Sequence, residues 1–224
     1  MRRHLRTLSA VLIAAGALLL ADAGLTLLWQ EPVSALYSRL QQGKLDDRLD
    51  RLERAPLAAG DRRALARLDA GRRLAFAARA QGRRSAPGDP LGRIRMPSIG
   101  VDDVFVEGTG TADLRSGPGH YPATPLPGQR GTVGIAGHRT TYGAPFHDLD
   151  GLDRGDRIEL VMPYGRFEYR VERTRIVAPT ATEVTRRVDH DRLILSACHP
   201  LYSAAQRIVI FARQVRAEPR GPAA

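Results

Sequence analysis

The sequence predicts a mainly β domain, a closed barrel, that follows a helical N-terminal third. From Leu91 onward, short runs of β-branched and apolar residues are separated by Gly, Pro and Asp turns. Before Leu91, Leu, Ala and Arg recur at helical spacing without β-branched runs. At least seven strands are expected, and closing them into an antiparallel barrel removes exposed sheet edges. The expected strands are 93–96, 101–106, 132–136, 157–162, 166–177, 193–196 and 208–215.

The first segment, residues 1–32, begins with arginines and continues as an apolar run from Leu8 to Trp29. A run of this length can span a bilayer as a helix, and the basic start would keep the N-terminus in the cytoplasm. Asp22 is costly inside a membrane, and Leu8 to Ala21 also fits a signal-peptide core with a cleavage site at 21–23. We expect a retained single-pass membrane anchor, with a cleaved signal as the alternative. Both place the rest of the chain outside the cytoplasm.

The second segment, residues 33–90, is predicted to be a helical stalk and a linker. Leucines between residues 36 and 52 recur at helical intervals, and Asp61 could cap a second helix that runs to about Gln81. A solvated stalk is expected, and a basic helix lying on a membrane surface is the alternative. Residues 85–90 form a linker by composition.

The formal net charge of +10 is concentrated near the N-terminus. Residues 1–90 hold 16 Lys+Arg against 9 Asp+Glu, and residues 91–224 hold 18 against 15. A nucleic-acid binder would concentrate basic residues on its folded module, so no nucleic-acid partner is expected. Contact with anionic lipid or wall polymer fits the distribution better. Lys44 is the only lysine, which indicates a GC-rich genome.

The only cysteine, Cys198, follows a short apolar run that reads as a buried strand. A lone cysteine is often no more than a small buried hydrophobe. Here Arg207 opens the next β-branched run, and a guanidinium beside a thiol can stabilise a thiolate or a developing oxyanion. His138 closes another strand-like run, after Gly137 lets the backbone turn. These features favour a reactive thiol.

The order strand-Gly-His, strand-Cys, strand-Arg resembles that of the sortases, the cysteine transpeptidases of Gram-positive cell surfaces. Three strings resemble class E sortases of high-GC actinobacteria. They are GPGHYPAT (117–124), AGHRTTYGAPF (136–146), and CHP followed by SAAQR (198–207). The resemblance covers about residues 91–216 and implies an eight-stranded mixed barrel.

The resemblance also implies a chemistry. Cys198 would attack the threonine carbonyl of a sorting signal such as Leu-Pro-x-Thr-Gly or Leu-Ala-x-Thr-Gly and form a thioester. Arg207 would stabilise the oxyanion, and His138 would protonate the departing glycine amine. A peptidoglycan precursor amine would then accept the acyl group, with hydrolysis as a side activity. The tail is polar rather than a second membrane segment, so attachment of single proteins is expected instead of pilin polymerisation.

Four further residues are candidates for substrate binding. His120 lies in a predicted turn, where it either caps the turn or touches the peptide, and Tyr142 either lines the groove or packs on the barrel. Ser196 and Ala197 precede the cysteine. The family usually carries Thr-Leu-x-Thr there, so Ala197 lacks a hydroxyl next to the nucleophile. The His199 side chain should point to the opposite face of the strand from that of Cys198, so His199 is not expected to act as the base.

The predicted domains are a membrane anchor or signal segment (1–32), a helical stalk and linker (33–90), a catalytic barrel (91–217) and a polar tail (218–224). No metal and no cofactor are expected, because the histidine and cysteine spacing matches no ligand set. One cysteine also precludes an internal disulfide.

Two alternatives compete with this reading. L,D-transpeptidases use the same residue types, but their signature puts Ser-His-Gly before the cysteine and an arginine two residues after it. Here Ser196 and Ala197 precede the cysteine, and Pro200 occupies the later position. The second alternative is a wall-binding barrel in which Cys198 is only structural. A peptide vinyl sulfone would trap an active thiol and leave a structural one unlabelled.

Overall fold

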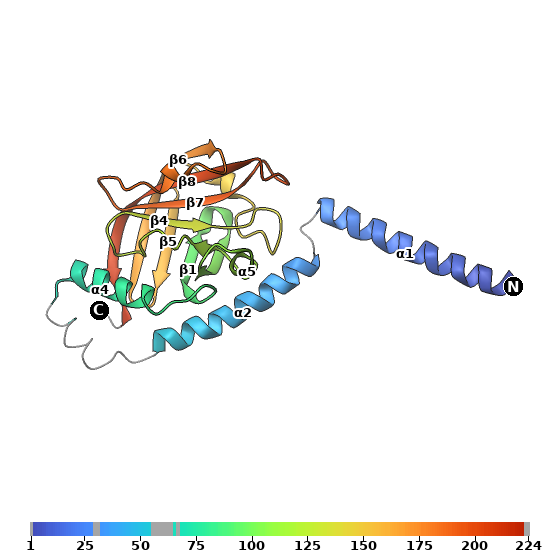
Figure 1. Ribbon diagram of the computed structural model, residues 1–224, viewed down its shortest axis with the longest axis horizontal. Coiled ribbons are helices and arrows are strands. Elements are labelled where there is room, and N and C mark those ends of the chain that lie inside the picture. Colours follow the sequence, from blue (N-terminus) through green and yellow to red (C-terminus); the bar gives the residue numbers. More distant parts are fainter. Residues whose placement is uncertain (1, 29–31, 55–64, 66–67, 222–224) are drawn as a thin grey trace.

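The structure, a computed structural model, describes residues 2–28, 32–54, 65 and 68–221. Eight strands form a closed barrel in the order β1-β2-β3-β4-β7-β8-β6-β5 (Figure 1). The strands are β1 Pro90–Met96, β2 Val101–Glu107, β3 Gly119–His120, β4 Thr132–Ala136, β5 Arg157–Met162, β6 Gly165–Val177, β7 Arg192–His199 and β8 Gln206–Pro219. This confirms the predicted mainly β barrel.

The described helices lie mostly before the barrel. They are α1 Arg2–Leu28, α2 Pro32–Arg54, α4 Ala70–Gly82 and the short α5 Thr111–Leu114. Three 3-10 turns interrupt the loops: η1 Pro97–Ile99, η2 Leu149–Gly151 and η3 Thr182–Thr185.

The barrel is mixed rather than antiparallel throughout. β2 pairs parallel with β3, and β4 pairs parallel with β7, whereas the remaining neighbours are antiparallel. The antiparallel barrel expected from the residue pattern is therefore corrected. All seven expected strands are present, and the eighth is β3, in a stretch that the pattern predicted as a turn. Two residues are too few to show a period.

Side chains that alternate along the strands divide the barrel into an interior and an outer face. The interior set of β4 and β7 consists of Val133, Ile135, Leu193, Leu195 and Ala197. On β8 it consists of Ile208, Ile210 and Ala212. The intervening residues of these three strands therefore point outward, and they include Cys198 of β7 and Arg207 of β8.

Helix α4 belongs to the barrel core. Leu74 and Ala78, one helical turn apart, are buried in the same cluster as the interior strand residues. The helix is capped by Asp69, whose side chain accepts a hydrogen bond from the Arg72 amide at 2.9 Å. This segment is therefore not a solvated stalk. Asp61, the predicted cap, lies outside the described residues.

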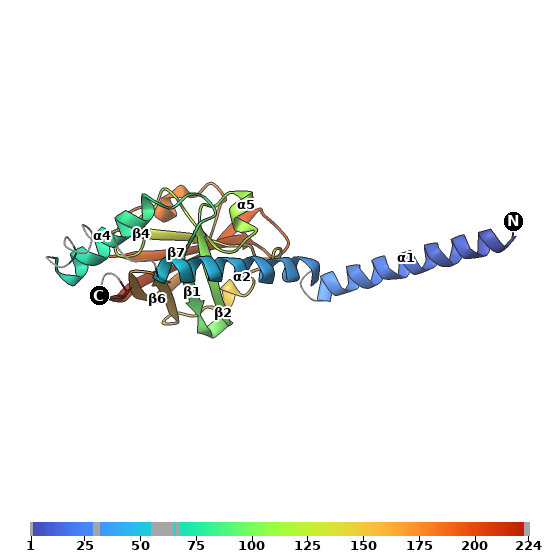
Figure 2. The same cartoon turned by 90° about the horizontal axis from the view of Figure 1, so that it is seen from below.

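Helix α2 also packs on the barrel. In Figures 1 and 2 it runs along the outside of β1 and β2. Leu45 and Leu49 bury their side chains against Val104 and Val106 of β2. The prediction of a solvated stalk is wrong for this face of the helix, because helical spacing shows an apolar stripe but not what covers it.

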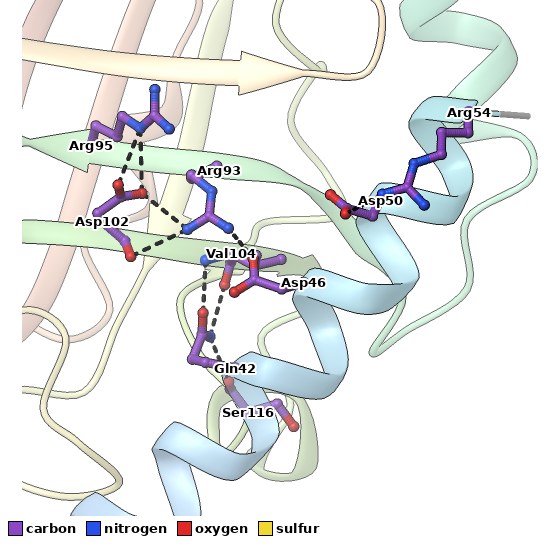
Figure 3. A network of polar contacts seen from close by, with 9 residues as sticks. All are labelled: Gln42, Asp46, Asp50, Arg54, Arg93, Arg95, Asp102, Val104 and Ser116. Carbon is purple, nitrogen blue, oxygen red and sulfur yellow. Dashed lines mark hydrogen bonds and ion pairs between the residues drawn. The ribbon is translucent and has the colours of Figure 1, made fainter.

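Gln42 of α2 completes an open edge of β2 (Figure 3). β2 pairs with β3 only at Val106 and Glu107. On that side of β2, the Val104 backbone therefore has no neighbouring strand to bond with. Its amide donates to Gln42 Oε1 at 2.8 Å, and Gln42 Nε2 donates to the Val104 and Ser116 carbonyls at 3.0 and 2.8 Å. A side-chain amide thus takes the place of a strand.

Helix α1 projects away from the barrel in both views (Figures 1 and 2). It covers most of the segment predicted to be a membrane anchor. Among the described residues, no helix is long and apolar enough to cross a membrane. The predicted run extends to Trp29, which lies outside the described residues, and the membrane anchor stays a prediction.

The C-terminal end of the barrel lies beyond its predicted limit. Pro219 of β8 pairs with Gly165 of β6, so 218–219 belong to the sheet and not to a tail. Residues 222–224 of the predicted tail lie outside the described residues.

Candidate active site

The parallel pairing of β4 and β7 brings His138 beside Cys198. Ala136 is opposite Ser196 in this pairing, and the Gly137 amide donates to the Ser196 carbonyl at 3.0 Å. His138 lies two residues after Ala136, and Cys198 lies two residues after Ser196. The two chains therefore carry the histidine and the thiol to the same end of the sheet.

Antiparallel pairing on the other side of β7 adds the arginine. Cys198 is directly opposite Arg207 of β8. Their neighbours Ala197 and Ile208 lie in the barrel core, so Cys198 and Arg207 point to the outer face. Cys198 is free and half-buried. We call His138, Cys198 and Arg207 the catalytic row, because they lie across three neighbouring elements in that order.

The surroundings of His138 shift the pKa of its imidazole. Burial lowers the pKa of His138 below its usual value, and the positive charge of Arg115 lowers it further. The imidazole is therefore predominantly neutral at pH 7 and can accept a proton. Its Nε2 is buried and has no hydrogen-bond partner among the described residues, which suits a group that bonds to a reactant.

Tyr142 packs beside the histidine. Its ring centroid lies 5.2 Å from that of His138, and the Arg115 guanidinium stacks 5.4 Å from the Tyr142 ring. Tyr142 has a positive φ of 51°, which is unusual for a residue with a side chain. This predicted groove residue thus lies at the catalytic row and holds Arg115 close to the imidazole.

The Arg207 guanidinium is fixed by the loop that precedes β8. Its Nη1 donates to the carbonyls of Ala204 and Gln206, both at 2.9 Å. A guanidinium carries five N–H donors in a rigid plane, so the remaining edge of the fork can face an oxyanion. The structure therefore fixes the guanidinium of the residue that is paired with Cys198 across the two strands.

Three of the four predicted substrate-binding residues are buried, namely His120, Ser196 and Ala197. His120 is 2% exposed, and its Nδ1 donates to Glu107 of the neighbouring strand at 2.9 Å. Ala197 is 3% exposed and belongs to the barrel core. For His120, burial favours the structural alternative over contact with a peptide, and Ala197 offers no exposed side chain for a peptide to contact. The hydroxyl that Ala197 lacks would point into the apolar interior.

Ser196 lies on the outer face together with a residue that the sequence did not reveal. The Tyr121 hydroxyl lies 2.8 Å from Ser196 Oγ, and the Tyr121 ring covers Gly134 of β4. A Cβ at Gly134 would come within 2.6 Å of that ring. A glycine inside a β-branched strand indicates close approach by another group, and that signal could have pointed to Tyr121.

No group of three or more His, Cys, Asp or Glu side chains could hold a metal ion within the part of the chain that the structure describes.

Comparison with known proteins adds independent evidence. Residues 94–215 match the profile of the sortase domain. The chain is 33% identical over 132 residues to Sortase D of Bacillus subtilis, which covers 57% of this chain and 65% of that protein. It is 26% identical over 161 residues to Sortase SrtE1 of Streptomyces coelicolor, which covers 63% of this chain and 46% of that protein. The chain thus spans about half to two thirds of the curated relatives that it matches.

Solved structures agree with this similarity. The structure of sortase E from Streptomyces avermitilis matches with a TM-score of 0.55 and 32% identity. The match covers 60% of this chain and 93% of that one.

Proposed function

Because this chain belongs to the sortase family, we propose that it is a cysteine transpeptidase that cuts a sorting signal between Thr and Gly and joins the released carbonyl to a cell-wall amine. The observation that best supports this proposal is the catalytic row on the outer face of the barrel. It offers a nucleophile, a proton carrier and an oxyanion donor side by side.

The first half-reaction forms a thioester. The Cys198 thiol attacks the threonine carbonyl while its proton passes to the neutral His138 imidazole. Negative charge develops on the carbonyl oxygen, and Arg207 donates hydrogen bonds to it. The carbon–nitrogen bond then breaks, and His138 returns the proton to the departing glycine amine. The acyl group remains on the sulfur.

The second half-reaction reverses these roles. An incoming amine attacks the thioester, and His138 removes the proton that the amine loses. The carbon–sulfur bond breaks, and the thiol is regenerated with that proton. Water in place of the amine gives hydrolysis, the expected side activity. A peptidoglycan precursor is the proposed natural amine.

We assign the chain to class E within the family. The strings at 117–124, 136–146 and 198–207 support this assignment, as does the 32% identity to the solved sortase E. The 33% identity to Sortase D is nearly equal to the 32% identity to sortase E, and it favours class D instead. Mass spectrometry of products from a library of Leu-Ala-x-Thr-Gly and Leu-Pro-x-Thr-Gly peptides discriminates between them by the preferred signal.

The function is tested with a quenched fluorescent sorting peptide and an added glycine-type amine. Wild-type protein is expected to cut the peptide and to form the ligated product. The matched Cys198→Ala variant should do neither, because no second thiol exists to replace the nucleophile. Absence of cleavage across the whole peptide library by folded wild-type protein would contradict the proposal.

We further propose that the barrel acts outside the cytoplasm. The arginine-flanked apolar run from Leu8 to Ala21 supports this, since such a run directs export whether it is retained or removed. Protease added to protoplasts, cells whose cell wall has been removed, should degrade the barrel. Protection until the membrane is lysed would contradict export, and N-terminal sequencing would distinguish a retained segment from one cleaved before Gly24.

A further inference from the structure

Arg139, the residue after the candidate catalytic histidine, is a buried arginine with its guanidinium fully engaged. It is 2% exposed. Its partners are the His147 carbonyl (Nε, 3.0 Å), His199 Nδ1 (Nη1, 3.1 Å) and Asp150 Oδ2 (Nη2, 2.5 Å). A buried charge that keeps three partners is held in a single geometry, because loss of any partner leaves a charged donor unsatisfied. The sequence did not single out this residue.

The two chain neighbours of His138 are both bonded to β7. On one side, the Gly137 amide donates to the Ser196 carbonyl. On the other side, Arg139 donates to His199. Residues 196 and 199 lie on either side of Cys198, so the two bonds bracket both the imidazole and the thiol.

The loop that carries His138 is closed by its own hydrogen bonds. The Phe146 amide donates to the His138 carbonyl at 3.0 Å, and His147 Nδ1 donates to the Arg139 carbonyl at 2.9 Å. With the Arg139 Nε bond to His147, these contacts make 137–148 a compact unit. The guanidinium then connects this unit to the end of β7 and to Asp150 in η2.

We propose that Arg139 is a positioning residue that acts through His199 to align His138 with Cys198 for proton transfer. This inference rests on the transpeptidase function proposed above. The guanidinium can only donate, so His199 Nδ1 accepts and carries no proton in this arrangement. His199 therefore serves as a hydrogen-bond acceptor that anchors the loop, and not as a second base.

Two substitutions at residue 199 test the role of the acceptor. His199→Asn keeps an oxygen close to the place of Nδ1, whereas His199→Leu removes it. We expect the asparagine variant to turn over the peptide within about threefold of wild type. The leucine variant should lose about 10²-fold in kcat with little change in KM, the scale of a misplaced catalytic group. Equal activity of the two variants, whether high or low, would overturn the proposal.

Arg139→Lys tests the guanidinium itself. Lysine keeps the charge but offers a point donor on a flexible stem, which cannot serve the three partners in their fixed directions. We expect a loss in kcat comparable to that of His199→Leu. The matched control is Arg192→Lys at the opposite end of β7. Arg192 is 5% exposed and donates to the Val184 and Arg186 carbonyls at 2.9 and 2.8 Å.

The control separates alignment from stability. Both lysine variants should lower the melting temperature, but only Arg139→Lys should lower kcat. If kcat falls in proportion to stability in both variants, Arg139 is merely structural and the proposal is overturned.

A last measurement is independent of the sorting peptide. The rate at which iodoacetamide alkylates Cys198 is followed against pH in wild type, His199→Leu and His199→Asn. If His199 keeps His138 aligned with Cys198, the pH profile of the alkylation rate should be the same in wild type and in His199→Asn. The profile of His199→Leu should differ from both. If no peptide is cut but these profiles still separate, the proposed function fails and the alignment stands. If the peptide is cut and all three profiles coincide, the alignment fails alone.

Discussion

Cys198 and Arg207 are directly opposite each other across β7 and β8 and face the same side of the sheet. The carbonyl oxygen of a substrate acylating Cys198 would thus develop its charge next to the guanidinium. This register supports the oxyanion role proposed for Arg207.

Arg207→Lys tests that role. We expect kcat/KM to fall by roughly 10²–10³, the cost of losing one oxyanion donor in other acyl-transfer enzymes. Lysine keeps the charge, but its single ammonium group cannot donate to the Ala204 and Gln206 carbonyls and to the oxyanion in the directions that a guanidinium can. Peptide cleavage with added amine measures the loss.

Ser203→Ala is the control for disturbance of the same loop. Ser203 Oγ accepts a hydrogen bond from the Ala205 amide at 3.2 Å, so its loss perturbs the turn without touching the guanidinium. It should lose much less activity. Near-normal turnover by Arg207→Lys would transfer the oxyanion role to backbone amides near Cys198.

Arg115→Gln should change the pH profile through His138. The Arg115 charge lowers the pKa of His138, so its removal raises that pKa, while burial still holds it below the usual value. The imidazole then becomes protonated at higher pH, and the acid limb of the kcat/KM profile should move upward. Arg130→Gln, an exposed arginine at the far end of β4, should leave the limb in place.

Nuclear magnetic resonance titration of the His138 ring checks the same shift without substrate. A His138 pKa that is unchanged in Arg115→Gln would show that the charge of Arg115 does not affect the imidazole.

Most of the barrel could be predicted because its strands are separated by clear turn residues. The expected strand 132–136 coincides with β4, for example. The parallel pairing of β4 with β7 could not be predicted from periodicity. A two-residue period shows to which face of the sheet a side chain points, but it does not show which strand lies alongside. The catalytic row depends on that pairing. The residue pattern indicated its three members as candidates, and the family resemblance implied a mixed barrel without specifying this pair of strands.

The surroundings of the row were predicted less well. His120 and Ala197 were chosen for their place in the chain, whereas their exposure depends on packing that no local pattern reports. Tyr121 and Arg139 act through contacts with β7 that are distant in sequence. Long-range contacts of this kind are fixed by the tertiary fold and not by spacing.

The part of the chain before Leu91 should stabilise the barrel. Leu74 lies in the core, so Leu74→Ala should lower the free energy of unfolding by about 2–5 kcal/mol. Leu52→Ala on α2, where the side chain is 47% exposed, should change it by less than about 0.5 kcal/mol. Denaturant titration of both variants provides the comparison.

The same packing revises the proposed domain boundary. A fragment of 91–217 leaves the α4 contact surface of the barrel open, so it should be less stable than a fragment of 69–221. Equal unfolding midpoints for the two fragments would restore the boundary at residue 91.

Gln42→Ala should weaken the contact between α2 and the barrel (Figure 3). The substitution leaves the Val104 backbone groups without their partners, at a cost of about 1–3 kcal/mol. Gln41→Ala, the preceding residue in the same helix, is the matched control and should be nearly neutral. Hydrogen exchange at the Val104 amide gives a local readout, and protection unchanged in Gln42→Ala would contradict the assignment.

The central claim is that Cys198 carries the acyl group, and the intact mass of the protein tests it most directly. Wild-type protein is mixed with a sorting peptide without amine and stopped with acid. We expect an adduct equal to the peptide up to its threonine carbonyl, located on Cys198 and released when an amine is added. His138→Ala should accumulate little of it. Peptide cleavage that continues in Cys198→Ala, or an adduct located on another residue, would show that Cys198 does not carry the acyl group.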